Sequence, residues 1–288
     1  SGEMAVGVQR HWFSVGTIVA WGKSGVGVVA TQSFVNPAYG PKGLQLMEEG
    51  ISATEALEKL TAEDEGRDFR QVGFLDATGN VSSFTGEKCV QSAHHFIGDN
   101  FAVQANMMLN DKVVPAMAKA FESYSNLPLA ERVVKVLFAA QEAGGDIRGK
   151  QSAALLVVNA QPVENIWQDK KVDLRVDDSL EPLLELERLL TVHRAYDHMN
   201  RGDLAVEVND MDTALAEYGA AGQLFPDNLE MKYWTAIALA NNNRLEEALP
   251  IFKTVFAKDS NWKTMTSRLP KSGLLNVSQN DLKKIMGQ

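Results

Sequence analysis

The chain has 288 residues, of which 45% are hydrophobic and 23% charged, so it can build a substantial core and is expected to divide into two domains. Its formal net charge of −9 excludes a nucleic acid or an anionic membrane as the expected partner, because phosphate binding draws on clustered Lys and Arg.

One cysteine, Cys89, excludes an intramolecular disulfide framework and supplies no metal-binding cluster. The longest apolar runs fall short of the roughly 20 residues that a membrane-spanning helix needs, and no signal segment opens the chain. We therefore expect a soluble, cytoplasmic protein without a membrane partner, a metal site or a cofactor.

Two strands and two helices are predicted in the first 62 residues. Residues 3–10 alternate apolar and small side chains, and residues 26–33 form a second strand that ends in Thr31, Gln32 and Ser33. A turn-rich loop follows at residues 36–43. Helical periodicity is expected over residues 43–49 and 52–62, the second opening with a Ser52–Glu55 capping box.

The middle of the chain continues with a β-hairpin, in which residues 71–76 and 81–85 flank a turn. Residues 101–109 form another expected strand, whose interior carries Gln104 and Asn106. Buried amides need partners, since an unpaired polar group costs about 1–3 kcal/mol. The remaining expected elements of this region are helices over residues 113–124 and 129–143 and strands over 152–158 and 172–177.

The stretch from residue 143 to residue 158 concentrates polar groups where a buried strand begins. A helix ends at Gly144 and Gly145, and a short loop then carries Asp146, Arg148, Gln151 and Ser152. Asp146 and Arg148 form a charge-assisted pair or face a ligand. A plain helix-to-strand turn with a solvated ion pair is the alternative interpretation.

Hairpins followed by helix pairs differ from the strict βαβ alternation of a doubly wound parallel sheet, so the order of elements favours an antiparallel α+β fold. The glycine cluster at residues 22–27 lacks the spacing of a phosphate-binding loop.

Five sequence blocks, in order, resemble the bacterial family called domain of unknown function ten twenty-eight. They are NPAYGPKG at 36–43, QVG at 71–73, QAN at 104–106, GGDIRGKQSAA at 144–154 and VDLRVDD at 172–178. The resemblance spans roughly residues 1–195. It implies a place among the N-terminal-nucleophile (Ntn) hydrolases, with a four-layer αββα sandwich and hydrolysis of small amide or N-acyl substrates.

In such enzymes the first residue supplies a nucleophilic side chain and its own α-amine serves as the base. Family members usually begin with a strand ahead of the Gly-Glu-x-x-Val strand that this chain enters at Gly2. Ser1 takes the place of the preceding turn, so the nucleophile is expected upstream of Ser1. The expected pocket residues lie at strand tips and in loops: His11, Gln32, Ser33, Asn36, Tyr39, Asn106, Asp146, Arg148, Gln151 and Ser152.

The C-terminal part shows a 34-residue repeat, in which Ala214, Leu215, Tyr218 and Ala221 correspond to Ala248, Leu249, Phe252 and Val255. This period resembles tetratricopeptide helices. Because about three stacked repeats are needed for independent stability, the array is expected to lean on the first domain, a neighbouring subunit or a partner. A last helix is expected to begin at Ser278.

The expected domains are residues 1–180, a linking helix over residues 181–202 and a helical domain over residues 203–288. Two functions are compatible with this organisation. The first is amide hydrolysis in a homo-oligomer, and the alternative is a non-catalytic assembly protein whose helices make contacts between protomers or with another protein.

Overall fold

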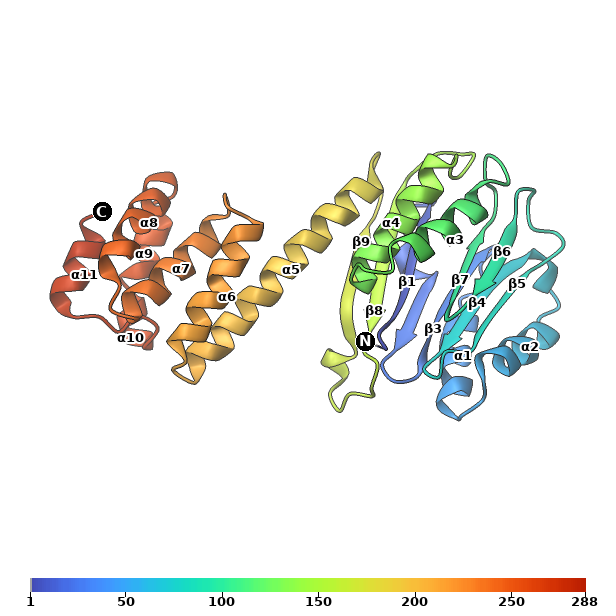
Figure 1. The fold of residues 1–288 in the computed structure, drawn as a ribbon, viewed down its shortest axis with the longest axis horizontal. Coiled ribbons are helices and arrows are strands. Elements are labelled where there is room, and N and C mark those ends of the chain that lie inside the picture. The colour runs from blue at the N-terminus through green and yellow to red at the C-terminus, as the bar shows by residue number, and fades with distance from the viewer. Residues whose placement is uncertain (1) are drawn as a thin grey trace. The chain divides into compact units, whose positions relative to one another are not determined.

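The computed structural model describes residues 2–288 and divides into two compact units, Ser1–Leu190 and Thr191–Gln288 (Figure 1). Helix α5 (Pro182–Glu207) runs through the division. Sheets lie in the first unit and only helices in the described part of the second, so the predicted order of sheets followed by a helical region is confirmed. Across residues 2–288, no helix is long and apolar enough to span a bilayer.

The strands of the first unit form three sheets in which all paired strands are antiparallel, as predicted. Strands β2 and β6 were not predicted, because the side chains of β2 are all half-buried and most of those of β6 are exposed, so neither shows alternation. The first sheet has the spatial order β1 (Met4–Arg10), β8 (Ser152–Val158) and β9 (Lys170–Val176). The second has the order β2 (Ala20–Lys23), β3 (Gly27–Ser33), β4 (Arg70–Asp76) and β5 (Val81–Thr85). The third is the pair β6 (His94–Gly98) and β7 (Phe101–Ala105).

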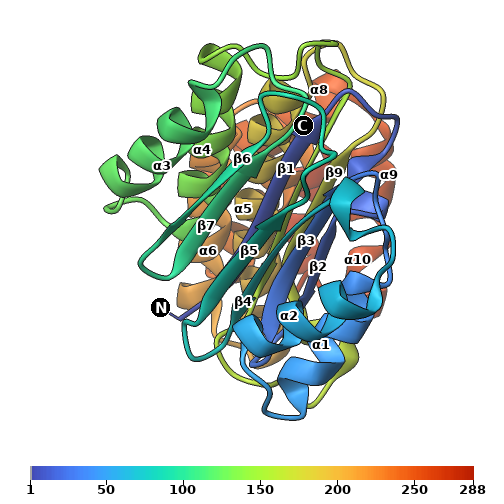
Figure 2. The same ribbon diagram turned by 90° about the vertical axis from the view of Figure 1, so that its right-hand side faces the viewer.

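Two helix pairs cover opposite sides of these sheets (Figure 2). Helices α1 (Tyr39–Glu48) and α2 (Ala53–Glu63) pack on the β2–β5 sheet, whereas α3 (Val113–Ser123) packs on β6 and β7 and α4 (Leu129–Glu142) packs on β1 and β8. Strands β1 and β8 face β2 and β3, and β7 faces β4. Apolar side chains such as Val6, Val28 and Leu156 fill the space between the facing sheets.

Helix α1 begins at Tyr39, four residues earlier than the helix predicted over residues 43–49, and it takes up part of the predicted loop. Pro41 lies in the first turn of α1, where a missing backbone N–H leaves no intrahelical hydrogen bond unmade. The phenol of Tyr39 is thereby drawn into the core beneath α1 and is 2% exposed.

Asp76, at the end of β4, organises the predicted hairpin turn and also holds the start of α2. Its two carboxylate oxygens accept from the backbone N–H groups of Ala53, Thr78 and Asn80 and from the side chains of Thr78 and Asn80, at 2.6–3.1 Å. Burial opposes ionisation, but the hydrogen bonds from Thr78, Ala53 and Asn80 outweigh it, so the pKa of Asp76 is lowered. The Ser52–Glu55 capping box is confirmed beside it.

We expect Asp76→Ala to lower the free energy of unfolding by about 2–4 kcal/mol at pH 7, because five hydrogen bonds to a nearly buried carboxylate are lost. A lowered folded-state pKa stabilises the protein above the unfolded pKa of about 3.9, and this contribution disappears as pH falls through the folded value. Urea unfolding of both proteins at pH 7 and at about pH 3 should therefore show a shrinking difference. Asp99→Ala, at an exposed turn position, is the control; equal losses for both variants would contradict the assignment.

Gly7 allows α4 to pack directly against β1. A Cβ atom at this position would lie 2.3 Å from Cγ1 of Val133 on α4. Helix α4 therefore lies close over β1 and forms one wall beside its free edge.

The helical unit contains the predicted repeat on α6 (Met211–Leu224) and α8 (Leu245–Lys258). Corresponding positions share the same environment: Tyr218 and Phe252 are 2% and 0% exposed, and Ala214 and Ala248 are fully buried. Helix α7 (Leu229–Asn241) lies between them in sequence, and Asn228 caps its start by accepting from two backbone N–H groups.

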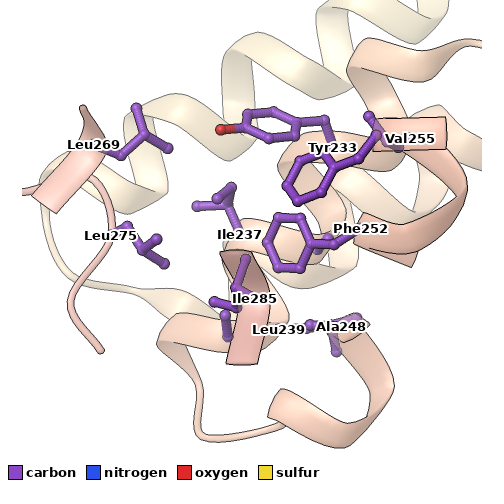
Figure 3. Close-up of a cluster of buried hydrophobic side chains, with 12 residues drawn as sticks. Tyr233, Ile237, Leu239, Ala248, Phe252, Val255, Leu269, Leu275 and Ile285 are labelled. Atoms are coloured by element: carbon purple, nitrogen blue, oxygen red, sulfur yellow. The ribbon is translucent and has the colours of Figure 1, made fainter. Parts of the chain in front are cut away.

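The repeats are flanked by helices of their own unit, which was not among the three supports that the sequence predicted. Side chains of α5 such as Ala195 and Met199 pack against α6, and Leu269, Leu275 and Ile285 join the core around Phe252 (Figure 3). Leu269 lies in α10 (Leu269–Ser272) and Ile285 in α11 (Gln279–Met286), and Leu275 lies between these two helices. Both helices follow α9 (Asn261–Thr266). Ser278 caps α11 as predicted, so the short array packs against its own flanking helices.

Candidate functional site

A groove of about 210 Å³ lies between β1 and β7 in the first unit. Residues 3–10 and 100–106 form its two sides, and the described residues pair β1 only with β8 and β7 only with β6. The β2–β5 sheet closes one face through Val28 and Leu75, and helices α3 and α4 close the other through Met117 and Val133. The groove is therefore a partly open cleft, covered on two faces and bordered by two unpaired strand edges.

Most of the groove is apolar, but buried side-chain amides gather at one end. Oε1 of Gln71 accepts from Nε2 of Gln32 at 2.6 Å and from Nδ2 of Asn106 at 3.0 Å. Nε2 of Gln71 donates to Thr85 Oγ1 and to the backbone carbonyls of His94 and Ala105. This network ties β3 and β4 to the end of β7.

A charged cluster lies at the same end. Arg148 donates to both carboxylate oxygens of Asp146, at 3.0 and 2.7 Å, and the backbone N–H groups of Arg148 and His11 donate as well. Burial opposes ionisation of Asp146, but these bonds outweigh it and lower its pKa. Asp146 also forms an isolated β-bridge with Met108, two residues after Asn106.

Arg10, the last residue of β1, also faces this end of the groove. Its Nη2 donates to the carbonyl of Ser33 at 3.1 Å, and its Nε is buried without a partner among residues 2–288. Burial lowers the pKa of Arg10, the nearby Arg148 lowers it further, and Asp146 acts in the opposite direction. Arg10 is thus a cation held in a poorly solvated place.

Backbone strain accompanies these polar groups. Ser33 and Met107 have φ values of 71° and 59°, in the left-handed region that non-glycine residues seldom occupy. Ser33 Oγ and Asn106 Oδ1 are buried and have no partner in the described part of the chain. Strained residues and orphaned polar atoms are typical of functional sites.

The structure brings together six of the ten sequence-predicted pocket residues. Gln32, Asn106 and Asp146 line the groove, Arg148 pairs with Asp146, and Ser33 accepts from Arg10. His11 contributes its backbone N–H to Asp146, while the residue itself is exposed. Asn106 lies just after β7 rather than inside the predicted strand, because β7 ends at Ala105.

Asn36 and Tyr39 belong to a different cluster, around Asp64. Nδ2 of Asn36 and the hydroxyl of Tyr39 both donate to Oδ2 of Asp64, which also accepts from Arg70 at 3.0 Å. Burial and the carboxylate of Asp64 raise the pKa of Tyr39. This cluster adjoins a smaller hollow beside α1 and not the groove between β1 and β7.

Gln151 and Ser152 hold loops in place. Ser152 Oγ donates to the carbonyl of Trp12 at 2.6 Å and accepts from the N–H of Val15, and Nε2 of Gln151 donates to Asp178. Ser152 is fully buried. These contacts fix the segment that follows β1 and leave neither residue facing the groove.

Arg10 and Gln71 were absent from the sequence-predicted pocket. Gln71 lies directly opposite Gln32 in the β3–β4 register, so the two amides meet through strand pairing over a separation of 39 residues. Arg10 is a charged residue at the end of an alternating strand, and this position could have indicated that it belongs to the pocket. No group of three or more His, Cys, Asp or Glu side chains in residues 2–288 has the arrangement of a metal site.

The comparisons with known proteins agree with this division of the chain. Residues 1–186 match the model described as Family of unknown function (DUF1028), and residues 205–269 match a model described as Tetratricopeptide repeat. A crystal structure of a Silicibacter pomeroyi protein, described with the same family, is similar with a TM-score of 0.59 and 28% identity, over 66% of this chain and 82% of that one. No curated protein sequence matches the chain. Since the first match covers well over half of the chain, the protein belongs to the family of unknown function DUF1028.

Proposed function

We propose that the first unit is a hydrolase of amide bonds in small N-acyl compounds, built as an αββα sandwich of the Ntn type. The observation that carries this proposal is the polar end of the groove, where orphaned atoms of Arg10 and Asn106 meet the Gln32–Gln71 network beside an open strand edge. The helix pairs on opposite sides of the facing sheets are consistent with this layered fold.

The groove lies between two free strand edges, where one more strand could pair. Backbone N–H and C=O groups on a strand edge require partners when water is excluded, and an apolar ligand cannot supply them. One extended chain between β1 and β7 would pair with both edges. It would join the β1–β8–β9 and β6–β7 sheets into a single layer.

We assign this position to a strand that precedes Gly2. Gly2 has a φ of 73°, a conformation suited to a tight turn. A hairpin that turns there pairs antiparallel with β1, so the first residue of the added strand lies beside Arg10, where β1 ends. The nucleophile would thus arrive at the polar end of the groove.

The proposed chemistry needs one residue and one water molecule. The hydroxyl or thiol of the first residue attacks the substrate carbonyl carbon while its α-amine takes the proton. The C–N bond breaks, the amine leaves with that proton, and water then hydrolyses the acyl-enzyme to release the acid. A buried side-chain amide or backbone N–H would stabilise the oxyanion, where the loss of one donor costs about 10²–10³ in rate.

The test is carried out on the native protein purified from its source. Intact mass and N-terminal sequencing should find a Thr, Ser or Cys ahead of a strand that leads into Gly2, and a panel of N-acyl amides should be hydrolysed. Changing that first residue to Ala should abolish turnover without changing the circular dichroism spectrum. Amide hydrogen exchange gives a readout that is independent of activity: the inserted strand should slow exchange of those amides of β1 and β7 that face the groove.

A native chain that starts at Ser1, with alternate amides of β1 exchanging rapidly and no turnover, would contradict the proposal. That result would favour the non-catalytic alternative, an assembly protein in which the tetratricopeptide-like unit supplies contacts to a second copy or to another protein.

A further inference from the structure

We propose that Arg10 binds a substrate carboxylate at the polar end of the groove, beside the first residue of the proposed strand, and that the substrates are N-acyl-α-amino acids. This inference rests on the proposed hydrolase function and deepens it. One donor of the Arg10 side chain is committed to the carbonyl of Ser33, while its Nε is buried and unpartnered within residues 2–288.

The positive charge of Arg10 is not neutralised by direct contact. Asp146 is the nearby carboxylate, and it is occupied by two side-chain hydrogen bonds from Arg148 and two backbone N–H groups. Arg10 is half-buried, and a cation that is partly removed from water without an ion pair is destabilising, so an anion that reaches it gains more than at an exposed arginine. Arg10 Nε and its neighbouring NH₂ groups match the geometry of a carboxylate.

Asn106 adds the feature that separates an N-acyl amino acid from a simple anion. Its Oδ1 is buried and unpaired in the described part of the chain, and its residue lines the same groove end as Arg10. An oxygen of this kind accepts a hydrogen bond. In an N-acyl-α-amino acid the amide N–H is one carbon away from the carboxylate, so the two groups can engage Asn106 and Arg10 together.

The lining next to Arg10 and Asn106 includes apolar residues, which suit an uncharged amino-acid side chain. Val8 and Met108 line the groove close to Arg10 and Asn106 in sequence, and neither can pair with a second charge. The inferred ligand therefore has one carboxylate, one amide N–H and an apolar side chain.

The experiment is isothermal titration calorimetry on the full chain with N-acetyl-L-leucine and with its neutral analogue N-acetyl-L-leucinamide. The wild-type protein should bind the acid at least about tenfold more tightly, since a charge-assisted pair distinguishes the two. Arg10→Gln should reduce this ratio to near one, and Arg10→Lys should retain part of it. Arg188→Gln, which removes an exposed arginine paired with Glu185, should leave the ratio unchanged.

Two further ligands separate the inferred class from general anion binding. Acetate and inorganic phosphate lack the amide N–H and should bind at least about tenfold more weakly than N-acetyl-L-leucine. Equal binding of acid and amide by the wild type, equal binding of phosphate, or an unchanged preference in Arg10→Gln would each overturn the inference. The comparison of ligands on the wild type needs no variant, so it stands even if Arg10→Gln unfolds.

The outcomes also separate this inference from the proposed function. Binding of the acid does not require a nucleophile, so a preference for the acid without turnover by the native protein would reject the hydrolase and keep the anion site. Turnover of neutral N-acyl amides without a preference for the acid would do the reverse.

Discussion

Gln71→Met is expected to lower the free energy of unfolding by about 3–5 kcal/mol, although methionine has nearly the same size and shape. The side chain of Gln71 is fully buried and takes part in five hydrogen bonds. Methionine would leave the donors of Gln32 and Asn106 without their acceptor, and each buried unsatisfied group costs about 1–3 kcal/mol. Urea unfolding followed by circular dichroism measures the loss.

Gln45→Met is the matched control for this substitution. Gln45 is exposed on α1 and donates to Glu49, one turn further along the helix. Its replacement should change the unfolding free energy by about 0.5 kcal/mol or less. If the two variants lost the same free energy of unfolding, the amide network at the end of the groove would not stabilise the fold as we expect.

Phe252→Ala should destabilise the helical unit by about 3–5 kcal/mol. Phe252 is fully buried at the centre of the cluster in Figure 3, with its ring 6.1 Å from that of Tyr233 and 5.5 Å from that of Phe256. Domains of this size are commonly stabilised by only about 5–15 kcal/mol. Removal of the ring should therefore speed amide hydrogen exchange in peptides from residues 208–288.

Peptides from the sheets of the first unit provide the internal reference, since their exchange should not change. Leu204→Ala is the control within the helical unit, because Leu204 is 61% exposed and its truncation opens no cavity. If amide hydrogen exchange in the helical unit were equally fast in Phe252→Ala and Leu204→Ala, the stability of the repeat core would not depend on Phe252.

The sequence allowed prediction of those parts of the fold that depend on local chemistry. The Ser52 capping box, the hairpin turn after Asp76 and the 34-residue repeat each rest on residues close in sequence or at a fixed period. Strand β6 escaped prediction because it is an exposed edge strand whose burial does not alternate. The start of α1 was misplaced because two prolines and two glycines in residues 36–43 suggested a loop more strongly than a helix.

The candidate site was predictable where a polar residue interrupts an apolar strand. Asn106 was identified in this way and Gln32 from the polar end of its strand, but Gln71, the acceptor that joins them, depends on the β3–β4 register and on contact with β7. Tyr39 was assigned to the pocket from its place in a loop. The structure places it against Asp64, because helix formation turns its hydroxyl toward the end of α2.

The layers on two faces of the groove would impose an order on folding if the proposed strand fills it. A strand that lies between β1 and β7 is covered by α3 and α4 on one side and by the β2–β5 sheet on the other, so late insertion requires these layers to separate. A segment that forms a hairpin with β1 during synthesis avoids this barrier, because it leaves the ribosome before residues 113–142. Adding the same segment as a free peptide to the finished protein should therefore give slow association, limited by the rate at which the helices open.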